Sequence, residues 1–257
     1  MGGAAIAALA AGADRLRALH GGPGVLVLPN AWDAASARAF EEAGFPAVAT
    51  TSAGVAEAIG HRDGEHAPVE EVLDAVGRIC RAVSVPVTAD LEGGYGLDPV
   101  HLVHGLLGAG AVGLNLEDTD HRGAGPLVDA EVQAGRLAAV KEAGRARGVD
   151  VVLNARIDVH VRQVGPEEGR LAEAVRRGRR YREAGADCLY PIAVSDEAEL
   201  RALVADTGAP INVLLRPGAP PVSRLAELGV ARATFGSGLM RTAVRAATLQ
   251  AGDARDA

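Results

Sequence analysis

The chain is poor in lysine, cysteine and aromatic residues, and each shortage excludes or disfavours a kind of active site or of core. Lys141 is the only lysine and falls in a predicted helix far from any strand end, which excludes an aldolase that forms a Schiff base. Cys80 falls in a predicted helix and Cys188 begins a predicted strand, so both are typical of small buried residues rather than of a disulfide or a metal pair. Aromatic residues make up 3% of the chain, so the core must be built from small aliphatic side chains.

Sequence features of membrane, nucleic-acid and phosphate-binding proteins are also missing. No apolar run approaches the length of a membrane span and no basic residues precede an apolar segment near Met1, so we expect a cytoplasmic protein. The formal net charge of −7 argues against a nucleic-acid surface. The chain has neither a glycine-rich phosphate loop opening a helix nor a nucleophile elbow.

A strand followed by a loop and a helix recurs eight times along the chain. Continuous apolar runs are typical of strands buried on both faces. The predicted strands span Val25–Asn30, Ala47–Thr50, Pro86–Glu92, Ala111–Asp118, Val151–Asp158, Cys188–Ile192, Ile211–Leu215 and Ala231–Gly236. The predicted helices span Ala34–Ala43, Val69–Val83, Pro99–Ala109, Val132–Arg147, Gly169–Ala184, Glu197–Thr207 and Val222–Leu228.

This pattern predicts an α/β fold, a single (β/α)8 barrel of the TIM type. One domain is expected over residues 1–257, with an N-terminal helix at about 4–20 and a frayed tail at 252–257. A doubly wound open sheet is the alternative, but it requires fewer strands or a topological switch that the sequence does not show.

The segment from Ala89 to Gly96 begins as a buried strand and ends as a glycine-rich loop with two carboxylates. Strand alternation places Asp90 and Glu92 on one face, and the glycines allow close approach of the backbone to a ligand. In a barrel the carboxyl ends of all strands face one mouth. The other polar side chains expected there are Asn30, Thr51, Ser52, His61, Arg62, Asp63, Asn115, Glu117, Asp118, Asn154, Arg156, Asp158 and Asn212.

Such a ring of oxygen ligands with few histidines favours Mg²⁺ or Mn²⁺ over zinc. Arg156 offers a bidentate dock for a carboxylate or a phosphonate. For Asp158 and Arg62, strand-end salt bridges that close the barrel are an equally open interpretation. Trp32 is expected to pack rather than to touch a ligand.

Six segments stand in a fixed order and spacing along the chain: Pro29–Ala37, Thr51–Ala56, Gly60–Asp63, Asp90–Gly96, Asn115–Asp118 and Asn154–Asp158. In these segments, and between about Leu28 and Met240, the chain resembles the isocitrate lyase/phosphoenolpyruvate mutase superfamily. Together, in this order and spacing, the segments are a specific signal of the family. Any one segment alone would be a weak signal. The resemblance implies an α/β barrel whose last helix is often exchanged between subunits, and therefore a homo-oligomer, either a dimer or a tetramer.

The resemblance also implies roles for individual residues. Asp90 would bind Mg²⁺ directly, and its water ligands would be held by Asp63, Glu92 and Glu117. The residues that bind the carboxylate substrate would be Thr51, Ser52, Ala53, Gly94, Arg156 and Asn212. The catalytic candidates are Arg156, His121 and Tyr95. The cation would chelate a 2-oxo acid, and cleavage at the neighbouring carbon would leave an enolate stabilised by the cation and Arg156.

The loop after the fourth predicted strand departs from the family. Lyase members carry a cysteine there as proton donor, beside a lysine, whereas Thr119–Pro126 contains neither residue. This disfavours an isocitrate or methylisocitrate lyase of the usual kind and a phosphonate enzyme that depends on a loop lysine. His121 is a replacement acid in one interpretation and a solvent-exposed loop histidine in the other. Glu92 stands where the family more often has aspartate.

Three functional hypotheses follow. The first is a Mg²⁺-dependent lyase or decarboxylase for a small 2-oxo or 2-hydroxy di- or tricarboxylic acid. The second is cleavage or rearrangement of a P–C bond, for which Arg122 is the obvious loop cation. The third is a keto-acid-binding paralogue without activity. The nearly complete ring of oxygen ligands favours an enzyme, and we place the first hypothesis ahead.

Overall fold

The computed structural model describes residues 2–255 as an α/β fold whose strands pair in parallel. The strands are β1 (Leu26–Leu28), β2 (Asn30–Ala31), β3 (Val48–Thr50), β4 (Val87–Asp90), β5 (Gly113–Glu117), β6 (Val152–Ile157), β7 (Cys188–Pro191), β8 (Asn212–Leu214) and β9 (Arg232–Thr234). The helices are α1 (Gly3–Leu19), α2 (Ala34–Glu42), α3 (Ser52–Ala58), α4 (Val69–Ala82), α5 (Pro99–Ala109), α6 (Ala130–Ala146), α7 (Glu167–Glu183), α8 (Glu197–Thr207), α9 (Val222–Glu227) and α10 (Gly238–Arg255).

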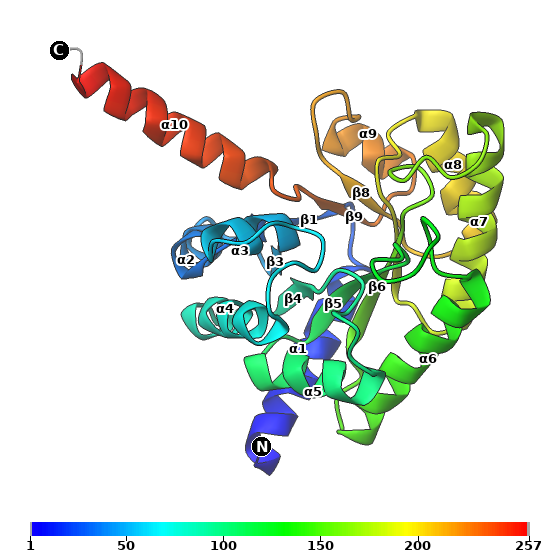
Figure 1. Cartoon of the computed structure of the whole chain (residues 1–257), viewed down its shortest axis with the longest axis horizontal. Helices are drawn as coiled ribbons and strands as arrows, with labels where there is room; N and C mark the ends of the chain where they lie inside the picture. Colours follow the sequence, from blue (N-terminus) through cyan, green and yellow to red (C-terminus); the bar gives the residue numbers. More distant parts are fainter. Residues whose placement is uncertain (1, 256–257) are drawn as a thin grey trace.

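Strand pairing runs around the molecule as the barrel prediction requires. One sheet has the order β2-β3-β4-β5-β6-β7 and the other the order β1-β9-β8. A parallel bridge between Leu189 and Ile211 links the β7 end of the first sheet to the strand that leads into β8. At the other junction β1 and β2 are halves of one extended segment that is interrupted at Pro29, which has no N–H to donate. Helices α4 to α8 surround the strands (Figure 1), and the predicted fold class is confirmed.

The helices begin where the sequence supplies a capping side chain. Asp33 accepts a hydrogen bond from the Ser36 N–H at 2.7 Å and forms a capping box with that serine at the start of α2. Asp98 caps α5 by accepting from two backbone N–H groups, and Gly110 ends the same helix in the left-handed region with φ 95°. These local stops set the loops that carry the functional side chains.

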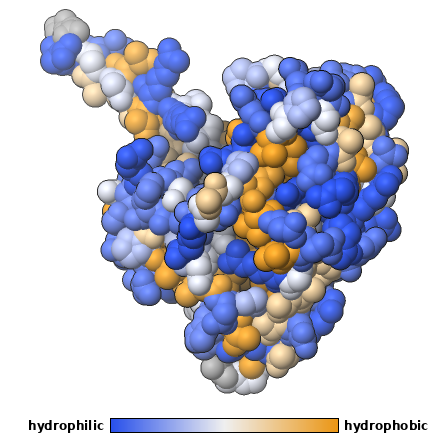
Figure 2. Space-filling model, turned by 45° about the vertical axis from the view of Figure 1, so that its right-hand side comes forward, coloured by the Kyte–Doolittle hydropathy of each residue, from blue (hydrophilic) through white to orange (hydrophobic). Residues whose placement is uncertain are grey.

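Two helices depart from the sequence prediction. Residues 52–58, which are absent from the predicted helices, form α3, because Thr51 Oγ1 accepts from the Gly54 N–H and begins a helix. Residues 252–255 of the tail predicted to be frayed continue α10, while 256 and 257 lie outside the described residues. Helix α10 projects from the body (Figures 1 and 2), and Val244 and Leu249 on it are 54% and 60% exposed. No helix in residues 2–255 is both long and apolar enough to cross a membrane.

Polar side chains occupy the barrel below its mouth. The Asn154 amide donates to Asn115 Oδ1 at 2.8 Å, which joins β6 to β5. Arg232 on β9 is 0% exposed, and none of its three guanidinium nitrogens has a hydrogen-bond partner within residues 2–255. Burial lowers the pKa of this guanidinium. A buried cation without a partner costs free energy of folding.

We therefore expect Arg232→Met to stabilise the protein by about 1 to 3 kcal/mol, because an apolar chain replaces an unpaired buried charge. The free energy of unfolding in urea measures the effect. Arg156→Met is the matched control and should destabilise, because the Arg156 guanidinium is paired with two buried carboxylates. A loss of stability in Arg232→Met equal to that of the control would show that Arg232 has a partner in solution.

Candidate active site

A cavity of about 530 Å³ opens at the carboxyl ends of the strands. A smaller cavity of about 200 Å³ adjoins it, and Ser52, Asp63 and Arg156 line both. The larger cavity is also lined by the predicted site residues Thr51, Ala53 and Asp90. The smaller cavity is also lined by the predicted site residues Glu92, Glu117 and His121. Side chains from distant parts of the sequence therefore meet at one mouth.

Three other predicted site residues lie around these cavities without lining them. Asn212 is fully buried on β8, where its Oδ1 accepts from Thr234 Oγ1 at 3.2 Å. Tyr95 and Gly94 lie in the loop after β4, and the Tyr95 hydroxyl donates to Glu92 Oε1 at 2.5 Å. Burial raises the pKa of Tyr95, so its hydroxyl keeps its proton and acts as a donor to Glu92.

Asp90 lies at the mouth and has one carboxylate oxygen that is buried without a hydrogen-bond donor among the described residues. Its Oδ2 accepts from the Ser52 N–H at 3.2 Å, whereas its buried Oδ1 has no hydrogen-bond partner within residues 2–255. Burial raises the pKa of Asp90, and the Arg156 guanidinium opposes that rise. A buried carboxylate oxygen without a donor is a suitable ligand for a hard cation.

Within residues 2–255, the acidic side chains near Asp90 are not grouped as joint metal ligands. No group of three His, Cys, Asp or Glu side chains in residues 2–255 is arranged to hold a metal ion together. An ion at Asp90 would therefore take this carboxylate as its protein ligand and complete its coordination with water, which is the usual arrangement for Mg²⁺. Asp63 lines the same cavity and stands available to hold such water.

Glu92 holds the loop that carries Asp63 through hydrogen bonds from the backbone of that loop. Its Oε2 accepts from the N–H groups of Gly64 at 2.8 Å and Glu65 at 2.7 Å, while Tyr95 occupies Oε1. Burial raises the pKa of Glu92, and the charge of Asp63 adds to the rise. Glu92 and Tyr95 both have positive φ, 48° and 56°, a strained backbone that persists where the surrounding structure holds it. Glu92 thus positions Asp63 through the backbone.

Arg156 is fixed by carboxylates on both sides. Its Nη1 lies 2.5 Å from Glu117 Oε2, and its Nε and Nη2 donate to Asp158 at 2.7 and 2.9 Å. Thr119 donates to Asp158 Oδ2 at 2.5 Å, which completes the support of that acid. Asp158 therefore orients Arg156, in keeping with the salt-bridge interpretation of this residue. Such bidentate pairs hold a guanidinium in one plane.

His121 lies inside the site, and the interpretation as a solvent-exposed loop histidine was wrong. Its side chain is 16% exposed and its Nε2 lies 2.7 Å from Glu117 Oε1. Burial raises the pKa of Glu117 to about 7, although Arg156 lowers it. The hydrogen bond to Glu117 raises the pKa of His121. The pair can hold a proton at the edge of the cavity at neutral pH.

His61 and Asp118, both in the predicted ring, have structural roles. His61 pairs with Glu71 at 3.2 Å. Trp32, outside that ring, packs edge to face on Phe40 with ring centroids 6.3 Å apart. Asp118 accepts from Arg177 at 3.0 Å and from Tyr181 at 2.7 Å, which ties β5 to α7.

Two cavity-lining arginines were missed by the sequence analysis. Arg216 follows β8 and Arg241 lies in the first turn of α10, and both line the larger cavity. Period-two alternation from Asn212 through Leu214 leads to Arg216, and a Pro-Gly turn follows it, so the pattern used for Asp90 would have found this residue.

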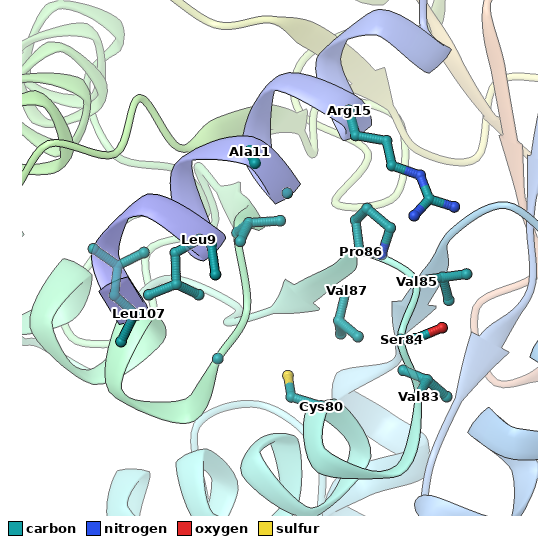
Figure 3. A pocket seen from close by; sticks show the side chains of 15 residues that line it. Leu9, Ala11, Arg15, Cys80, Val83, Ser84, Val85, Pro86, Val87 and Leu107 are labelled. Carbon is teal, nitrogen blue, oxygen red and sulfur yellow. The ribbon is translucent and has the colours of Figure 1, made fainter. Parts of the chain in front are cut away.

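The opposite end of the barrel holds a different cavity, of about 600 Å³, between α1 and the start of β4. Figure 3 shows that its labelled side chains are mostly apolar, including Leu9, Val87 and Leu107. Cys80 also lines it, and burial raises the pKa of this thiol to about 12. The thiol is therefore neutral and not activated for nucleophilic chemistry.

The chain is similar to known proteins in both sequence and fold. The family model for phosphoenolpyruvate phosphomutase matches residues 16–254. The oxaloacetate decarboxylase of Rhodopseudomonas palustris is 31% identical over 221 residues, which cover 83% of this chain and 72% of that protein.

Solved structures agree. A Burkholderia cenocepacia protein provisionally assigned as a lyase or mutase superposes with a TM-score of 0.88 at 36% identity, over 97% of this chain and 89% of that one. A 2,3-dimethylmalate lyase described as a PEP mutase/isocitrate lyase superfamily member superposes with a TM-score of 0.83 at 26% identity, over 95% of this chain and 86% of that one. The chain therefore belongs to the phosphoenolpyruvate phosphomutase family, within the isocitrate lyase/PEP mutase superfamily, and is an enzyme of the lyase or mutase type.

Proposed function

We propose that this protein is a Mg²⁺-dependent carbon–carbon lyase or decarboxylase for a small 2-oxo or 2-hydroxy di- or tricarboxylic acid. The observation that carries the proposal is the buried, unpartnered Oδ1 of Asp90 in a cavity that Arg156 also lines. When bound, Mg²⁺ (or Mn²⁺) would supply a Lewis acid for the substrate oxygens. Asp90 would hold the ion directly, and Asp63 and Glu117 would hold its water ligands. The similarity to an oxaloacetate decarboxylase supports a substrate of this class.

Arg156 is suited to the charge that the reaction develops. Breaking a carbon–carbon bond next to a carbonyl leaves its electron pair on the product as negative charge. The guanidinium is already fixed by Glu117 and Asp158, so it need not reorganise when that charge appears. The substrate carboxylate would meet Arg156 together with Thr51, Ser52 and Ala53, which line the same cavity.

The product carbanion then needs a proton, and we assign His121 as its donor. This histidine lines the smaller cavity and is paired with Glu117. It stands in the loop where lyases of the superfamily carry a cysteine. The hydrogen bond to Glu117 raises the pKa of His121, which favours the protonated form that a general acid needs.

Cleavage or rearrangement of a P–C bond is the weaker alternative. That chemistry requires a cation in the loop after β5, and Arg122 is the candidate. Its Nε pairs with Glu65 Oε2 at 3.1 Å, its side chain is 61% exposed, and it lines neither cavity of the mouth. The third hypothesis, binding without reaction, is separated from the first by the measurement below.

Turnover of oxaloacetate, methylisocitrate and phosphonopyruvate should be measured with Mg²⁺ and with EDTA. We expect Mg²⁺-dependent loss of a carbon substrate, and a roughly 10³-fold fall in kcat/KM in Asp90→Asn, because a Lewis acid contributes several kcal/mol to such a reaction. Asp74→Asn on α4, whose side chain is 79% exposed, is the control and should not change turnover.

Two results would contradict the proposal. Phosphate release from phosphonopyruvate, without loss of a carbon substrate, would establish P–C chemistry. A keto acid that raises the melting temperature in Mg²⁺ without any turnover would establish a binding protein.

His121→Gln tests the proton donor. We expect kcat to fall by roughly 10²- to 10⁴-fold with little change in KM, because the substrate contacts remain while proton delivery is lost. His104→Gln, on the exposed side of α5, is the matched control. Unchanged kcat in His121→Gln would remove this residue from the mechanism.

We further propose that α10 packs against a second copy of this chain. The helix projects from the body (Figure 2), and Val244 and Leu249 on it are exposed. Most of the stability of a helix in a protein comes from packing of its apolar face, which α10 lacks along these residues.

Light scattering on a sizing column tests this assembly. Leu249→Glu should yield a smaller species than the wild type, because a charge enters the apolar contact, whereas Gln250→Glu adds the same charge one position along and should not. A wild-type monomer would overturn the assembly.

A further inference from the structure

Arg232 lies one layer of side chains below the larger cavity. Thr234 on β9 lines that cavity, and alternation along the strand puts Arg232 on the same face, two residues nearer the start of β9. Arg232 also pairs in register with Asn212 of β8, whose Oδ1 accepts from Thr234 Oγ1 inside the barrel. The fully buried guanidinium therefore extends into the barrel beneath the cavity.

Three titratable side chains near this guanidinium are neutral at neutral pH. Cys188 and Tyr190 share a face of β7, and Tyr190 lines the cavity. Burial raises the pKa of the Cys188 thiol and of the Tyr190 hydroxyl to about 12, although the charge of Arg232 opposes both rises. Burial and the charge of Arg232 lower the pKa of His20, which follows α1, to about 4. Of these four side chains, Arg232 alone carries a charge.

Arg156 and Arg232 differ in what surrounds their charge. The Arg156 guanidinium is paired with Glu117 and Asp158. The Arg232 guanidinium has no hydrogen-bond partner within residues 2–255. Asp90, which lines the cavity, opposes the fall in the pKa of Arg232 that burial causes, so the two side chains interact electrostatically across the cavity floor. A charge in a buried space acts more strongly at a given distance than a charge in water, and dissolved salt screens it less.

We propose that Arg232 is a specificity-determining residue whose buried charge favours the binding of anions in the cavity without touching them. This role rests on the proposed function, which places a carboxylate substrate at Arg156 above this charge. Arg156 would bind the substrate by hydrogen bonds, whereas Arg232 would add an attraction that depends only on the charge of the substrate. A dianion would gain about twice the free energy that a monoanion gains, and Mg²⁺ would be repelled. A charge that costs free energy of folding is then retained for function.

Calorimetric titration of Arg232→Met with oxalate and oxamate in saturating Mg²⁺ tests this role. The two probes have nearly the same shape, but oxalate carries two negative charges and oxamate carries one. We expect the Kd of oxalate to rise roughly 10- to 100-fold and that of oxamate roughly 3- to 10-fold, because the energy lost is proportional to the charge of the ligand. Titration with Mg²⁺ alone should show the opposite change, a Kd roughly 10-fold or more lower in Arg232→Met.

Two further variants separate charge from packing. Arg232→Gln removes the same charge but keeps a polar side chain, so its Kd values should match those of Arg232→Met within about threefold. Cys188→Ala alters the packing of the same layer without changing its charge and should leave all three Kd values within about twofold of the wild type. Unfolding in urea shows whether each variant is folded.

Equal weakening of oxalate and oxamate, or weaker Mg²⁺ binding in Arg232→Met, would overturn this role and show that Arg232 supports the site by packing. Wild-type Kd values in both Arg232 variants would also overturn it. The proposed function would stand in either case if Asp90→Asn abolishes Mg²⁺-dependent binding of oxalate. If oxalate binding to the wild-type protein does not depend on Mg²⁺, the proposed function fails and the role of Arg232 fails with it.

Discussion

The site depends on one buried cation held between two carboxylates. Arg156 reaches the cavity from β6, and Glu117 on β5 and Asp158 after β6 keep its guanidinium in place. Without these acids the charge would be desolvated and uncompensated, and without the arginine the acids would face each other in a buried space. His121 joins the same cluster through Glu117. The groups that hold a carboxylate and a proton are therefore members of a single electrostatic unit rather than independent residues.

The charge of Arg156 opposes the rise in the pKa of Asp90 that burial causes. Glu92, in the loop after β4, is used to fix the neighbouring loop through backbone N–H groups. Asp90 is left facing the cavity with one oxygen satisfied by Ser52 and one open. Desolvation of that oxygen costs free energy of folding. A protein keeps such an unfavourable buried group where the group serves to bind a ligand.

Most of the fold was predictable because strand and helix periods repeat in a barrel. The positions of Asp90, Glu117 and Arg156 followed from strand ends alone, since parallel strands present these ends at one mouth. Other features depend on contacts between segments far apart in sequence. Glu92 fixes the neighbouring loop because it accepts hydrogen bonds from the N–H groups of Gly64 and Glu65. His121 is held in the site by its contact with Glu117. A local sequence pattern encodes neither of these contacts. The Arg232 guanidinium has no hydrogen-bond partner within residues 2–255, which sequence periodicity does not reveal.

A crystal structure with Mn²⁺ and oxalate would test the central claim most directly, because anomalous scattering locates the metal without assumptions. The account predicts one peak at about 2.2 Å from Asp90 Oδ1, with the oxalate between that ion and Arg156. A peak bound to Glu92 or Glu117 but not to Asp90, or oxalate bound away from Arg156, would contradict it.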